Sequence, residues 1–207
     1  MFGGYVECDC QIQLDNENAY YLQAVLTDGK LNEVATDLTI QQHDFAGQAY
    51  AGIRLHGDSS GSHTTRGDGY VTLQNARIYE VPVMLALLNV LRIKEPDRTA
   101  FDQGQMEFTV NGENIDFQKI ELNGDALSLI GQGTVNLDSE IDMDFYTTMG
   151  RNRWFIPVLT KLYHAGSKQV WWVEVDGTLG KPNTEHQVLP ALTDPLKKLF
   201  PEFTTDQ

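Results

Sequence analysis

Residues 69–93 read GYVTLQNARIYEVPVMLALLNVLRI, in which a strand-like stretch runs directly into an almost continuous apolar segment, Val81 to Leu91. This segment could be a membrane span, a core helix or a lid over an apolar ligand. Its eleven residues are too few for a membrane-spanning helix, which needs about 20. Pro82 suits the first turn of a helix, so we expect an amphipathic helix over 83–91. This helix is predicted to cover the open end of a sheet through Leu85, Leu88 and Leu91, which recur at helical spacing.

The stretch YVECDCQIQL at residues 5–14 alternates between apolar and polar residues. Such alternation predicts a strand in a sheet with one apolar and one hydrated face. Cys8 and Cys10 lie on the apolar side and are the only cysteines in the chain. Neighbouring positions on one side of a strand are poorly placed for a disulfide, and two cysteines without a nearby histidine pair make no zinc site. We therefore expect both to be small buried residues.

Period-two patterns and turn residues recur along the chain and predict consecutive antiparallel strands. Further strands are expected at 20–27, 49–55, 70–79, 105–110, 114–122, 126–137, 141–147 and 170–179. The phase of the alternation slips within 114–122, which predicts a bulge there. A short helical turn is expected at 30–38, and helices at 155–162 and 196–203. The sequence thus predicts one mainly β (α+β) domain over 1–207, with a few short amphipathic helices on the apolar face of its sheet.

Composition limits the functional classes. Hydrophobic residues make up 41% of the chain and charged residues 21%, and the formal net charge is −14. Phosphate binding requires clustered Lys and Arg, so this charge argues against nucleic acid and against a polybasic membrane-surface patch. The first residues lack the pattern of a secretory signal peptide. We expect no membrane-crossing segment in this chain.

Catalytic and metal-binding signatures are weak. Residues 57–61 read GDSSG, which is similar to the nucleophile loop of trypsin-like proteases but lacks its second glycine. Glu140, Asp142 and Asp144 share one strand face, where side chains two residues apart are about 7 Å apart and fit a solvated surface better than a site. The five histidines have no metal-ligand spacing. We therefore expect no catalytic residues, no metal and no cofactor.

Three segments taken in order resemble the C-terminal region of the AsmA family, which includes TamB-related bacterial envelope proteins. They are GDGYVTLQNARIYEVPVMLALLNVL, FDQGQMEFTVNGENIDFQKIELNGDALSLIGQGTVNLDSEIDMDF and VEVDGTLGKP, and together they extend over residues 67–182. The resemblance implies an extended curved antiparallel sheet with a hydrophobic concave face. It also implies a non-enzymatic protein of the periplasm or cell envelope that carries lipids between membranes or aids outer-membrane assembly.

Family members are anchored in the inner membrane by an N-terminal helix, so the resemblance implies that the chain is part of a longer protein. The implied partners are phospholipid acyl chains and other envelope proteins. Two alternatives remain open: the helices fill the concave side and make it core, or the domain is a small-ligand or adhesive β-domain at the cell surface. The candidate lipid contacts share the apolar side of each alternation; they are Val6, Ile12, Leu22, Leu26, Ile53, Leu55, Met106, Phe108, Val110, Leu127, Leu129, Met143 and Phe145.

Overall fold

The computed structural model describes residues 2–14, 18–37, 45–78, 81–91, 101–124, 127–149 and 170–189. In this part of the chain ten strands form one antiparallel sheet in which spatial order equals chain order. The strands are β1 (Tyr5–Ile12), β2 (Tyr20–Lys30), β3 (Ala46–Gly57), β4 (Arg66–Arg77), β5 (Phe101–Asn111), β6 (Asn114–Gly124), β7 (Leu127–Asn136), β8 (Glu140–Met149), β9 (Val170–Thr178) and β10 (Lys181–Leu189). The prediction of a mainly β fold built on a curved antiparallel sheet is confirmed.

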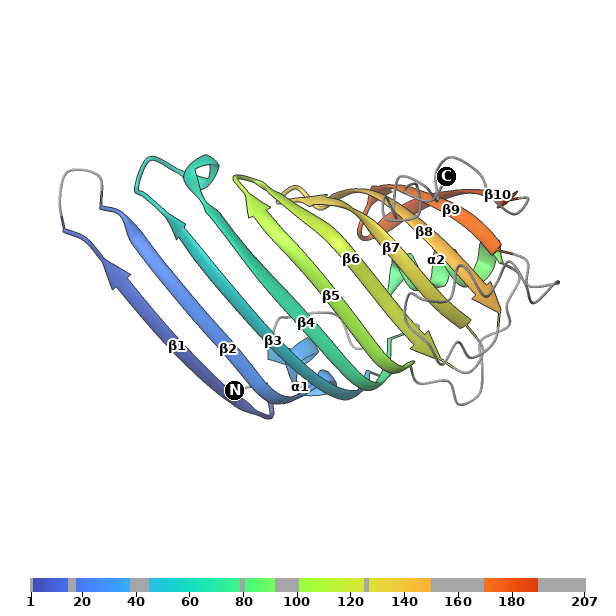
Figure 1. Cartoon of the computed structure of the whole chain (residues 1–207), viewed down its shortest axis with the longest axis horizontal. Helices are drawn as coiled ribbons and strands as arrows, with labels where there is room; N and C mark the ends of the chain where they lie inside the picture. Colours follow the sequence, from blue (N-terminus) through green and yellow to red (C-terminus); the bar gives the residue numbers. More distant parts are fainter. Residues whose placement is uncertain are drawn as a thin grey trace, which may run out of the picture.

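Short helices accompany the sheet. They are α1 (Leu31–Asp37), α2 (Pro82–Val90) and a 3-10 turn at Ser62–Thr64. Strands β1–β3 lie side by side at the end of the sheet away from α2, whereas β8–β10 curl round towards α2 (Figure 1). Because α2 also contacts β10, the helix lies inside the curl and closes one end of the sheet.

Local chemistry accounts for the connections. Asn111 pairs with Asn114, so the tight turn between β5 and β6 consists of Gly112 and Glu113. Gly112 has φ +65°, a conformation that glycine adopts without strain. The predicted bulge is present, since the register between β6 and β7 shifts between Phe117 and Ile120. In α2, Pro82 occupies the first turn as expected, and Val81 before it is extended.

The core is a single cluster of buried apolar side chains between α2 and the inside of the curl. From α2 and the residue after it, the cluster includes Val83, Met84, Leu87, Leu88 and Leu91, and from the strands Leu73, Ala76, Phe101, Ile120, Leu122, Leu129, Val135, Ile141, Met143, Phe145, Val173 and Val175. The cluster also includes Ala49 of β3, and all the other strand residues belong to β4–β9. The first three strands therefore contribute little to the core.

Four points differ from the expectations or lie outside the described residues. Cys8 and Cys10 are exposed rather than buried, because nothing covers the apolar side of β1 in the described part of the chain. Leu85 is only half-buried: the stripe that faces the sheet has the spacing of residues 84, 87, 88 and 91. Strand β10 was not predicted. The helices expected at 155–162 and 196–203 lie outside the described residues.

Candidate functional site

The strand register determines which side chains share a face, because directly opposed residues of antiparallel neighbours project from the same side. One row runs through Val6, Leu26, Ala51, Val71, Met106, Ile120, Gly131, Phe145 and Val173. A second runs through Cys8, Ala24, Ile53, Gly69, Phe108, Phe117, Gly133, Met143 and Val175. A third runs through Cys10, Leu22, Leu55, Gly67, Val110, Ile115, Val135, Ile141 and Gly177. These rows define what we call the apolar face.

The apolar face contains every candidate residue whose side chain the structure describes. Ile12 lies beside the third row on β1, and Leu129 lies beside the first row on β7. The side chain of Leu127, a further candidate, lies outside the described part of the chain. The sequence therefore predicted correctly which residues the sheet brings together on one side.

Exposure of the apolar face decreases steadily along the sheet. In the first row Val6 is 39% exposed, whereas Ile120 is 6%, Phe145 3% and Val173 0% exposed. We call the first part the open region; its candidate residues are exposed or half-buried, and they are Val6, Ile12, Leu22, Leu26, Ile53, Leu55, Met106, Phe108 and Val110. We call the second part the closed region; it contains Leu129, Met143 and Phe145, all buried. The two interpretations of the apolar face, exposed surface and core, therefore each hold for one part of it.

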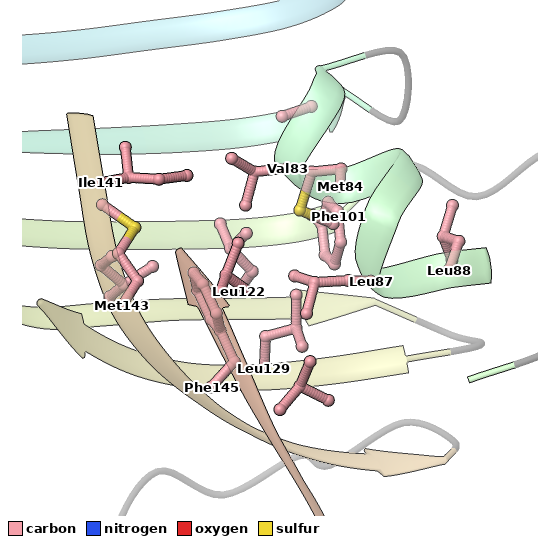
Figure 2. Close-up of a cluster of buried hydrophobic side chains, with 14 of the residues drawn as sticks. Val83, Met84, Leu87, Leu88, Phe101, Leu122, Leu129, Ile141, Met143 and Phe145 are labelled. Atoms are coloured by element: carbon pink, nitrogen blue, oxygen red, sulfur yellow. The ribbon is translucent and has the colours of Figure 1, made fainter. Parts of the chain in front are cut away.

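Helix α2 is what closes the second part. Figure 2 shows α2 beside Phe101, Leu122 and Leu129, with Val83 and Leu87 directed towards these strands. Leu87 and Phe101 are 0% exposed, so contact between helix and sheet is complete here. Of the three helix residues predicted to face the sheet, Leu88 and Leu91 are buried as expected and Leu85 is not.

An aromatic pair lies between the open and the closed region. The ring centroids of Phe108 and Phe117 are 5.5 Å apart, with 49° between the ring planes. The ring of Phe108 lies over Gly69 of β4, where a Cβ atom would collide with it. Because Gly69 has no side chain, the Phe108 ring can pack against the backbone of β4. The half-buried ring then presents a broad hydrocarbon surface on the apolar face.

The opposite face of β8–β10 is acidic. Asp142 is opposite Asp176, and Asp144, Glu174 and Glu185 are opposite one another on successive strands. Partial desolvation and then the neighbouring carboxylates, Asp144 first, raise the pKa of the Glu174 carboxyl above its ordinary value. Asp144 accepts a hydrogen bond of 2.8 Å from the Trp172 indole nitrogen. Despite this density of acids, the described residues contain no group of three or more that could hold a metal ion.

Two further features of the described chain bear on function. Asp68 follows Arg66 and Gly67 in β4, and its carboxylate is held 2.8 Å from the Arg54 guanidinium on β3. The Asp68 carboxylate therefore forms an ion pair with the neighbouring strand on the protein surface. Among the described residues no helix is long and apolar enough to cross a membrane.

Comparisons of the chain with protein-family models, with curated proteins and with solved structures found no match.

Proposed function

We propose that this chain is a non-enzymatic cell-envelope protein of the AsmA-like type that holds phospholipid acyl chains on the open region of its apolar face. In this proposal it carries lipids between membranes or aids outer-membrane assembly, within a longer protein anchored in the inner membrane. The observation that supports the proposal most is the exposure gradient: the same three rows that are buried at β8 are half-buried at β2 and β3 and exposed at β1.

Exposing such an apolar surface to water is energetically unfavourable. Contiguous exposed apolar patches are uncommon on monomeric proteins and mark contact with other molecules. An acyl chain gains about 0.8 kcal/mol for each CH₂ group that it removes from water. An acyl chain lying along the second row would contact Ile53 of β3 and Phe108 of β5, which flank Gly69 of β4. One lying along the third row would contact Leu22 of β2 and Leu55 of β3. The acidic opposite face would stay hydrated.

The proposed lipid-binding surface ends where the closed region begins. Helix α2 and the curl of β8–β10 fill the apolar face with buried side chains, so an acyl chain can be accommodated on β1–β5 but not between α2 and the strands. We therefore place the proposed contacts on the open region only. Leu129, Met143 and Phe145 act as core in this account, not as lipid contacts.

Native mass spectrometry of gently purified protein tests the proposal. We expect phospholipid to accompany the folded wild-type chain and to be lost from Leu22→Glu, because a carboxylate on the apolar face of β2 opposes hydrocarbon contact. Gln23→Glu is the matched control, since Gln23 is exposed on the opposite face of the same strand. We expect this variant to retain lipid.

Folded wild-type protein without phospholipid, prepared from envelope fractions under mild conditions, would contradict the proposal. Equal loss of lipid from both variants would contradict the assignment of the apolar face. Thermal melting of both variants establishes that they remain folded.

A further inference from the structure

Among the described strands, β1 is the first in the spatial order and pairs only with β2, so it is an open edge of the sheet. All eight of its residues are exposed. Its register with β2 is continuous from Tyr5 to Ile12, and it contains no residue of positive φ. It is thus a long, regular strand with one unpaired side, which is a template for another strand.

The other edge differs in the features that normally protect an edge. Strand β10 begins with Lys181 and Pro182, and lysine and proline at an edge discourage pairing with another chain. Strand β1 has neither. Several large hydrophobic side chains are exposed on β1 and just after its end. Tyr5 and Ile12 of β1 are 77% and 58% exposed, and Leu14, two residues beyond β1, is 89% exposed. The asymmetry indicates that the β1 edge is normally covered.

The hydrogen bonds show which groups of β1 are available. The Gln13 amide donates to the Ala19 carbonyl over 2.8 Å, so Gln13 and Ala19 form a hydrogen-bonded position that continues the β1–β2 ladder. Such pairs alternate along an antiparallel ladder. The N–H and C=O groups of Cys8, Cys10 and Ile12 therefore point away from β2, to the open side.

We propose that β1 pairs antiparallel with β1 of a second copy of this chain, about a two-fold axis at Cys10. In this register Cys8 is opposite the partner's Ile12, and Val6 is opposite the partner's Leu14. Asp9 is then opposite the partner's Gln11, and Glu7 is opposite the partner's Gln13. From Val6 to Leu14, every apolar side chain meets an apolar one and every carboxylate meets an amide.

Other registers are less favourable. A two-fold axis at Asp9 puts two carboxylates opposite one another, and an axis at Cys8 puts Glu7 opposite the partner's Asp9. Like charges directly opposed across a ladder are destabilising. An axis at Gln11 pairs fewer residues. A register that is shifted by one residue puts apolar residues opposite polar ones, such as Cys10 opposite the partner's Asp9.

The arrangement has a consequence for the whole sheet. The two-fold axis of an antiparallel strand pair is perpendicular to the sheet, so both copies present their apolar faces on the same side and the three rows continue from one copy into the other. The inference does not depend on what the apolar face binds, since it rests on the edge and its register.

Sedimentation of the full chain in the presence of reductant tests the association itself, and we expect a dimer at micromolar concentration. Cys10→Lys should give a monomer, because it places two cations opposite one another on the axis, whereas Cys10→Ser should remain dimeric. Circular dichroism of both variants checks that the sheet is intact. A wild-type chain that stays monomeric, or a folded Cys10→Lys variant that stays dimeric, would overturn the proposal.

Mild oxidation with diamide tests the register. The two Cys10 thiols would give up two electrons and two protons to diamide and form one S–S bond between the copies. Opposed residues of a hydrogen-bonded pair have Cα atoms about 5.5 Å apart, within the range that a disulfide spans. We expect Cys8→Ser to retain the cross-linked dimer and Cys10→Ser to lose it. The reverse result would place the axis elsewhere and contradict the proposed register.

Discussion

At the scale of single residues, two of the buried polar side chains, Thr147 and Glu121, give specific predictions. Thr147 lies on the apolar face of β8 and is 1% exposed, and its hydroxyl has no hydrogen-bond partner in the described chain. Glu121 lies on the opposite face of β6 and is 3% exposed, with its carboxylate 3.3 Å from the Lys119 ammonium group. Both carry a desolvation cost that exposed polar groups do not.

Replacing Thr147 with valine should stabilise the fold. The substitution keeps the shape of the side chain and removes a hydroxyl that is buried without a partner, so we expect a gain of about 1 kcal/mol in the free energy of unfolding. Denaturant titration measures this gain. Thr27→Val on the exposed surface of β2 is the control, with a change within about 0.5 kcal/mol. A destabilised Thr147→Val variant would show that the hydroxyl is needed.

Glu121 predicts a specific pH dependence. Burial raises the pKa of its carboxyl above the ordinary value of 4.5, although Lys119 opposes the shift. Below that ordinary value the carboxyl is protonated in the folded and the unfolded chain alike. As the pH rises through the raised pKa, the unfolded chain releases the proton more readily, so stability is lost.

We therefore expect Glu121→Gln to increase the free energy of unfolding more at neutral pH than at pH values below 4.5. Urea titrations of both proteins across this interval measure the difference. A gain that is the same at every pH would indicate that the effect comes from packing and not from the charge.

At the scale of elements, α2 determines where the apolar face changes from the exposed open region to the buried closed region. It buries four apolar side chains against the sheet, with Leu91 buried directly after it, and lies inside the curl of the last strands (Figure 1). Removing this helix from the sheet would expose the closed region as well. The contrast between the two regions is therefore a property of one short element.

The placement of α2 can be tested with a charge on its buried side. Leu88 is 2% exposed, so Leu88→Asp should lower the free energy of unfolding by about 3–5 kcal/mol. Asn89→Asp puts the same carboxylate on the exposed side of the same helix and should change stability little. Thermal melts of the two variants compare them directly. Similar melting temperatures for Leu88→Asp and wild type would show that the helix is peripheral.

The strands of the apolar face could be predicted from sequence because alternation is a local property of the chain. The residues that α2 buries could not, since a segment such as VMLALL is apolar on all sides and its periodicity does not distinguish Leu85 from Leu87. Strand β10 escaped prediction because its first residues are polar and its pairing with β9 defines it. The exposure of Cys8 shows the further limit: alternation predicts which side chains share a face, whereas tertiary packing decides what covers that face.

At the scale of the whole molecule, the sheet is a single surface with two environments. Its C-terminal part is stabilised by a conventional buried core, and its N-terminal part extends the same rows of apolar side chains into half-exposed positions. The acidic side chains on the far face of β8–β10 keep that side in water. Lipid handling, as proposed, would use the exposed part without disturbing the core that holds the sheet together.

The most direct test of this account is photo-crosslinking to phospholipid at matched positions. A benzoylphenylalanine at Phe108 lies on the open region, one at Thr109 lies on the exposed opposite face of the same strand, and one at Met143 lies in the closed region. With vesicles of dioleoylphosphatidylethanolamine and dioleoylphosphatidylcholine, we predict that position 108 labels lipid strongly and that positions 109 and 143 do not. Equal labelling at 108 and 109, or none at 108 in folded protein, would contradict the claim that the open apolar face binds acyl chains.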